Sequence, residues 1–171
     1  SLDAPLRMQM RSELKRIQRE TGVTVVYVTH DQIEAVALSN RLAMMNRGKI
    51  LQYDSPRVVY ERPANVFVAG FAGNPPYNLL DSRLVSDKGR PRLVSDGISI
   101  DIDETTAKKI ESRGSGSKLV IGIRPDQIEL ASNPVSNVAV RVKVSSIEPL
   151  GLNSLLELST GEESLRAILP A

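Results

Sequence analysis

A run of β-branched residues with one tyrosine, Val23 to Val28, lies between two segments whose patterns predict helices. The run is apolar on both faces, which is typical of a strand inside a parallel sheet that has helices above and below it. We therefore expect residues 23–28 to form a buried strand. Together with the helices on either side, it predicts that residues 1–80 form about half of an α/β domain.

The segment before this run is predicted to be an amphipathic helix. Asp3 can cap the helix, and Pro5 lies in its first turn, where a missing N–H group is harmless. Gly22 is suited to the left-handed conformation that ends many helices. The apolar residues recur at spacings of four, four and three, which places them on one stripe: Leu6, Met10, Leu14 and Ile17.

The segment after the run is predicted to be a second helix. Asp31 can cap its first turn, and Glu34, at the third helical position, can return a hydrogen bond to the cap. Two short apolar runs around Arg47-Gly48 then predict a hairpin. Ser55-Pro56 is typical of the start of a further short helix.

The composition changes near residue 73. The sequence GNPPYN contains a glycine and two prolines, which is typical of a linker. A helix-like piece follows at about residues 104–112. Short segments with a period near two indicate strands, which fits a small β-barrel or sandwich: they lie at roughly residues 118–123, 136–147, 152–158 and 164–169.

Composition argues against several classes of protein. The net charge is +2 over 171 residues, and neither half of the chain is basic enough to require a nucleic acid or an anionic membrane as its partner. Without cysteine there is no disulfide framework. No apolar run approaches the length of a membrane helix. Every aromatic residue lies at or before Tyr77, so the β-rich part offers no stacking platform for a nucleic acid.

His30 is the only histidine, and it stands where the predicted buried strand hands over to a helix. Position alone favours a packing role, with the imidazole hydrogen-bonded at the strand end. A binding role is the alternative, because ligands gather at the carboxyl ends of parallel strands and helix starts offer N–H groups to phosphates. Such a histidine can donate to a phosphate oxygen. His30 and Glu34 lack a third ligand, so no metal site is predicted.

Several segments together resemble one protein family. These are SLDAPLR at the start, TVVYVTHDQIEA at 24–35, NRGKI at 46–50, FVAGFAGNPPYN at 67–78 and GIRPDQIEL at 122–130. They resemble the C-terminal part of the ATP-binding subunit of bacterial sugar-type ABC importers, the maltose and glycerol-3-phosphate importer group. The resemblance covers essentially the whole chain and is densest through residues 1–80.

The resemblance implies roles for individual residues. SLDA resembles the D-loop, which reaches across the ATPase dimer, so Asp3 is expected at the nucleotide; a simple helix cap at Asp3 is compatible with this. His30 resembles the switch-loop histidine that contacts the γ-phosphate, which implies both a catalytic and a nucleotide-binding role. Arg124, in the GIRP segment, is expected to form a structural salt bridge or turn rather than a ligand contact.

The resemblance also implies the organisation of the chain. Residues 1–72 are expected to be the C-terminal part of a P-loop nucleotide-binding domain, and residues 73–80 a hinge. Residues 81–171 are expected to be an OB-fold-like regulatory β-domain, incomplete at its end. The expected fold class is therefore α/β plus β.

In the intact parent, the resemblance implies an ATPase that uses ATP and Mg²⁺ to import a sugar or related solute. Its partners would be a second ATPase subunit and the membrane-spanning permease subunits, at the cytoplasmic face of the plasma membrane. No nucleic acid is expected as a partner.

The departures from the family pattern are as informative as the matches. The phosphate-binding pattern G-x-x-x-x-G-K-[ST] is absent, as are the signature segment and the Walker B carboxylates. We therefore expect a C-terminal fragment that binds no nucleotide and is inactive alone. Its unpaired strand edges predict a homo-oligomer. The alternative is a stand-alone, non-enzymatic OB-like binding or regulatory module.

Overall fold

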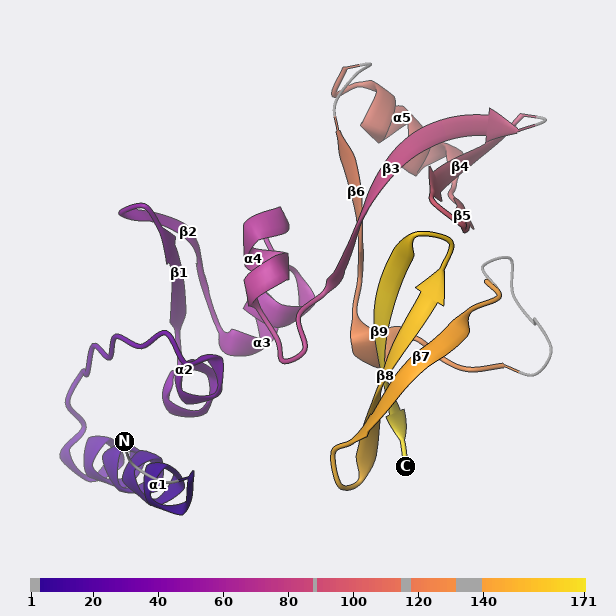
Figure 1. The fold of residues 1–171 in the computed structure, drawn as a ribbon. Coiled ribbons are helices and arrows are strands. Elements are labelled where there is room, and N and C mark those ends of the chain that lie inside the picture. The colour runs from indigo at the N-terminus through magenta and orange to yellow at the C-terminus, as the bar shows by residue number, and fades with distance from the viewer. Residues whose placement is uncertain (1–3, 88, 115–117, 132–139) are drawn as a thin grey trace. The chain divides into compact units, whose positions relative to one another are not determined.

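The computed structural model describes residues 4–87, 89–114, 118–131 and 140–171 (Figure 1). The chain divides into two compact units, Ser1–Asn74 and Pro75–Ala171, and the division falls inside the linker predicted from the sequence. Helices and sheets are mixed, as expected. In the described residues, however, all strand pairings are antiparallel, so the predicted parallel sheet is not observed.

The N-terminal unit begins with helices and contains one hairpin. Its elements in chain order are α1 (Ala4–Thr21), α2 (Gln32–Leu38), β1 (Leu42–Asn46), β2 (Lys49–Asp54), α3 (Pro56–Glu61) and α4 (Val66–Phe71). The predicted caps are confirmed at Asp31 for α2 and Ser55 for α3. Gly22 ends α1 with φ +67°, and its N–H donates to Gln18 O at 2.9 Å.

The predicted hairpin around Arg47-Gly48 is also confirmed. β1 and β2 pair antiparallel from Leu42 opposite Asp54 to Asn46 opposite Lys49. Arg47 and Gly48 both have positive φ, 47° and 76°, which matches the twist that a two-residue hairpin turn requires. The hairpin contributes to a small core shared with the two short helices that follow it: Met44, Val59, Val68 and Ala72, with Leu42 and Leu51 packed against them.

The prediction of a buried strand at residues 23–28 is wrong for this chain. These residues lie in an irregular connection between α1 and α2, and Val26 and Val28 are 88% and 91% exposed. A strand needs a neighbour to pair its N–H and C=O groups. In the described part of this unit the only sheet is the hairpin, whose strands pair with each other. Within the described residues the apolar run joins no sheet, and its valines face solvent. The stripe of α1 is likewise largely exposed.

The C-terminal unit is built from two antiparallel sheets. One has the strand order β5-β4-β3-β6 and the other β7-β8-β9. The elements are β3 (Asn78–Asp87), β4 (Arg90–Ser95), β5 (Ile98–Asp101), α5 (Glu104–Glu111), β6 (Leu119–Ile123), the 3-10 turn η1 (Pro125–Gln127), β7 (Lys143–Pro149), β8 (Asn153–Thr160) and β9 (Glu163–Pro170).

The two halves of β3 pair with different strands. Residues 78–82 pair with β6, and residues 83–87 pair with β4. One apolar core joins both sheets through Leu80, Ile98, Ile121, Leu156, Leu158, Leu165 and Ala167. The predicted β-rich unit with one helix is confirmed, while an OB-like topology stays a prediction.

Candidate functional site

The residues around His30 form a compact polar turn at the start of α2. Asp31 Oδ1 accepts hydrogen bonds from Ile33 N at 2.8 Å and from Glu34 N at 3.1 Å, as its predicted role as a cap requires. Those two amides are therefore already occupied. These two N–H groups at the helix start are therefore not available to a phosphate, contrary to the expectation from the sequence.

The predicted reciprocal bond from Glu34 to the cap is wrong. Asp31 N instead donates to Thr29 Oγ1 at 3.0 Å. The Thr29 hydroxyl in turn donates to Glu34 Oε2 at 2.9 Å, and the Tyr27 hydroxyl donates to the same oxygen at 3.2 Å. A threonine two residues before the cap supplies a nearer acceptor for the cap N–H, so the carboxylate is used elsewhere. Sequence reasoning singled out Glu34 but missed Tyr27 and Thr29.

The carboxylate of Glu34 affects the pKa of the Tyr27 hydroxyl. Desolvation, together with the hydrogen bond to Glu34 and the negative charges of Glu34 and Asp31, raises the pKa of the Tyr27 phenol above its usual value. The phenol therefore stays protonated and remains a donor through the physiological pH range.

His30 itself is exposed at the bend between Thr29 and Asp31. The packing role, which needed an imidazole hydrogen-bonded at a strand end, finds no support. Within the described residues the imidazole takes part in no hydrogen bond or ion pair. Both ring nitrogens are thus open to a ligand, and the neighbouring backbone is fixed by Thr29 and Asp31. This arrangement can offer a proton or a hydrogen bond to an oxyanion.

A second link ties the same turn to the end of this unit. Gln32, the first residue of α2, donates through Nε2 to the backbone oxygen of Phe71, the last residue of α4. Phe71 lies just before the division between the two units at Asn74. The segment that carries His30 is therefore bonded to the helix that precedes the linker.

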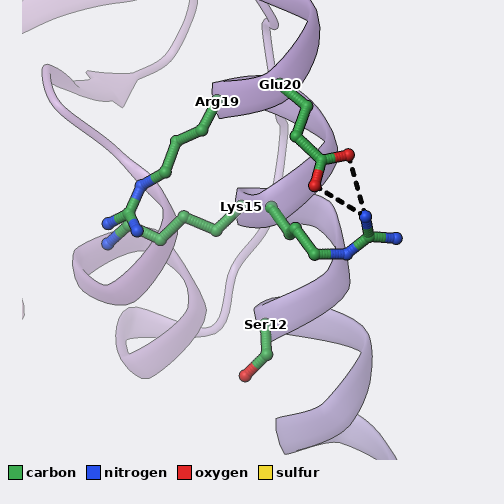
Figure 2. Close-up of a pocket in the computed structure, with 5 residues that line it drawn as sticks. Ser12, Lys15, Arg19 and Glu20 are labelled. Carbon is green, nitrogen blue, oxygen red and sulfur yellow. Dashed lines mark hydrogen bonds and ion pairs between the residues drawn. The ribbon is translucent and has the colours of Figure 1, made fainter.

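A shallow pocket on α1 contains basic side chains but is a helix contact rather than a ligand site. Figure 2 shows Lys15 and Arg19 extending together from α1, away from Glu20. Lys15 Nζ donates to Ala37 O at 2.8 Å, at the C-terminal end of α2, where a cation is favourable. Arg16 is bonded to Glu13 and Glu20.

The remaining predicted residues divide into two groups. Asp3 and the rest of the predicted D-loop, residues 1–3, lie outside the described residues. Arg124 forms the expected salt bridge, with Nε donating to Asp126 Oδ1 at 3.0 Å and a terminal nitrogen 2.8 Å from Oδ2. In the described ranges, no group of three acidic, histidine or cysteine side chains could hold a metal ion. Within the same ranges, no helix is long and apolar enough to cross a membrane.

The chain is 39% identical over 170 residues to the sulfoquinovosyl glycerol transport ATP-binding protein of Agrobacterium fabrum, covering 99% of this chain and 46% of the relative. It is 40% identical over 174 residues to the trehalose/maltose import ATP-binding protein of Thermococcus litoralis, covering 94% and 44%. It is 39% identical over 169 residues to the sn-glycerol-3-phosphate import ATP-binding protein of Yersinia pestis, covering 99% and 45%.

The chain therefore spans about half the length of the curated relatives it matches. No protein-family model matches it. The matches extend over nearly the whole chain, so both the unit that carries His30 and the β-rich unit have counterparts in the same proteins.

Proposed function

Because the chain belongs to the family of ATP-binding subunits of sugar-type ABC importers, we propose that it is part of a subunit that couples ATP hydrolysis to solute import. The solute would be a sugar or a related polyol. The observation that carries this proposal is the 39–40% identity across both units, combined with an exposed His30 on a fixed turn. In the subunit, residues 1–72 would complete a nucleotide-binding domain, residues 73–80 would be a hinge, and residues 81–171 an OB-fold-like regulatory domain.

His30 would contact the γ-phosphate of ATP. Its exposed imidazole suits this role, since it has no partner within the described residues and can donate a hydrogen bond to a phosphate oxygen. Charge that develops on the phosphoryl oxygens during transfer would strengthen this contact in the transition state. Asp3 would lie at the nucleotide across an ATPase dimer. Mg²⁺ would neutralise phosphate charge in the whole protein, with ligands other than these residues.

The partners would be a second copy of the subunit and the membrane-spanning permease subunits. A location at the cytoplasmic face of the membrane follows from such partners. The valines exposed at residues 23–28 support the proposal, because a run that is apolar on both faces is suited to a strand between neighbours. In the whole protein those neighbours would be strands of the nucleotide-binding domain.

The proposal is tested by His30→Ala in the full-length protein. The kcat for ATP hydrolysis should fall at least about tenfold, or about 1.4 kcal/mol of barrier, while ATP binding is largely kept. Arg57→Ala, which removes an exposed ion pair of α3, is the matched control and should leave kcat unchanged. A loss of less than about tenfold for His30→Ala would contradict the role of His30.

The 171-residue chain alone is proposed to bind ATP very weakly and to be inactive, because the sequence contains no phosphate loop. Phosphate release should be measured with Mg-ATP at micromolar protein. Turnover that survives rigorous repurification and disappears with His30→Ala would contradict this. A stand-alone binding module is the alternative, and it would require the β-rich unit to function without the rest of such a subunit.

A further inference from the structure

Glu34 is an unusual residue in this unit. Among the buried side chains of the described residues it is the only charged one, with 9% of its surface exposed. A buried carboxylate is costly unless hydrogen bonds replace the water it loses. Glu34 must therefore be compensated by its neighbours, and the identity of those neighbours shows what it holds in place.

The donors that compensate Glu34 both come from the segment before His30. Tyr27 and Thr29 donate their hydroxyl hydrogens to the same oxygen, Oε2. Neither donor carries a charge, so this is not an ion pair. The carboxylate instead folds an otherwise irregular segment back onto the first turn of α2.

Thr29 extends the contact to the other side of His30. Its hydroxyl donates to Glu34 and accepts from Asp31 N at 3.0 Å, while Asp31 caps α2. His30 is thus the one residue between two bonded neighbours. Its backbone is held on both sides, whereas its imidazole stays exposed.

We propose that Glu34 is a positioning residue for His30, acting through Thr29 and Tyr27 without touching the nucleotide. This inference rests on the proposed function. Holding the turn before the nucleotide arrives spares the cost of ordering it during the reaction, so the loss of Glu34 should lower kcat more than it weakens ATP binding.

The experiment uses the full-length protein with five variants. Glu34→Ala should lower kcat about tenfold, and Tyr27→Phe and Thr29→Val about two- to fivefold each, with KM for ATP changed less than about twofold. Glu34→Gln should recover much of the activity, because a single amide oxygen can accept from both hydroxyls. In the 171-residue chain, Thr29→Val should also speed hydrogen exchange at the Asp31 amide, because it removes the acceptor of that amide's hydrogen bond.

The fifth variant, His30→Ala, separates positioning from general stability. If Glu34 acts through His30, Glu34→Ala should have little further effect in the His30→Ala background. Matched controls are Glu20→Gln and Tyr53→Phe, at exposed positions of α1 and β2, and both should leave kcat unchanged. If Glu34→Ala does not fold, Thr29→Val and Tyr27→Phe still test the proposal.

Two results would overturn the inference. One is a Glu34→Ala loss that persists in full when His30 is already alanine; the other is unchanged kcat in both hydroxyl variants. An unchanged kcat for His30→Ala would instead contradict the proposed function of His30. The two failures are therefore distinguishable in the same set of measurements.

Discussion

Asn78 and Arg166 are joined by reciprocal hydrogen bonds across 88 residues of chain: Asn78 Nδ2 donates to Arg166 O at 2.9 Å, and Arg166 N donates to Asn78 Oδ1 at 2.7 Å. Asn78 Nδ2 also donates to Ile123 O at 3.2 Å. One buried side-chain amide thus replaces a backbone pairing between β3 and β9, and it connects the two sheets of the C-terminal unit.

Asn78→Ala should therefore destabilise the C-terminal unit. The change leaves the N–H and C=O of Arg166 and the C=O of Ile123 without this partner in a partly buried place, which should cost about 1–3 kcal/mol. Urea unfolding followed by far-ultraviolet circular dichroism measures the change. Asn153→Ala, at the exposed start of β8, is the control. A loss for Asn78→Ala no larger than for the control would show that the amide is dispensable.

Gly97→Ala should destabilise the same unit for a steric reason. Gly97 has φ +71°, and a Cβ there would collide with the Thr160 side chain. Gly89 has φ +79° with open space around it, so Gly89→Ala carries only the conformational cost, about 1 kcal/mol. We expect Gly97→Ala to cost about 1–2 kcal/mol more than Gly89→Ala, measured by thermal unfolding. Adding Thr160→Ala should relieve the excess; equal losses at the two glycines would contradict the clash.

The start of α5 should be sensitive to acid. The Thr106 hydroxyl donates to Asp103 Oδ2 at 2.7 Å and the Thr106 N–H to Oδ1 at 2.8 Å, and these bonds lower the pKa of Asp103 below its usual value. Because the pKa is lower in the folded state, ionised Asp103 stabilises the fold at pH values above its pKa in the unfolded state. This stabilisation is lost as the pH falls through the pKa of the folded state.

Thr106→Val should raise the pKa of Asp103 toward its usual value, because it removes the hydroxyl donor and keeps the N–H. Carbon-13 nuclear magnetic resonance of the carboxyl group measures the titration. Thr105→Val keeps both bonds and should leave the titration in place. If both variants titrate alike, the hydroxyl is not the cause.

The purified 171-residue chain should self-associate through its exposed valines. In the described residues this exposed apolar segment belongs to no sheet, so it can pair with the same segment of a second chain, as expected from the sequence for an unpaired strand. Val28→Lys should reduce the assembly seen by light scattering at several concentrations. Leu152→Lys, at an equally exposed position of 91% in the other unit, should have less effect. A clean monomer with the Val25 and Val26 amides protected from exchange would contradict this.

Features set by neighbouring residues were predictable from the sequence. The caps at Asp31 and Ser55, the turn at Arg47-Gly48 and the end of α1 at Gly22 depend on a few adjacent side chains, and each is observed. The predicted strand at residues 23–28 fails for the opposite reason. Its pattern fits a strand with neighbours on both sides, and in the described residues of this unit no strand lies beside it.

The sequence singled out His30 as a candidate, and its role stays a prediction, but the contacts around it could not be predicted. His30 stood out because it is the only histidine in a recognisable segment. The capping pattern drew attention to Glu34, but Thr29 Oγ1 is a second acceptor within reach of the Asp31 N–H, and spacing alone does not rank the two. The contact between Asn78 and Arg166 leaves no pattern in the sequence, because the two residues lie 88 positions apart and only the folded strands bring them together.

The divided pairing of β3 implies an order of assembly for the C-terminal unit. Its second half meets β4 through a short turn, so this hairpin can close early. Its first half can pair only after β6 is in place, because β6 lies farther along the chain: Asn78 bonds Ile123 across 45 residues. The bond to Arg166 closes a loop of nearly twice that length, which adds only about 0.6 kcal/mol of chain entropy, and we expect it to form last. A strand that begins this unit is therefore completed only when the end of the unit has been synthesised.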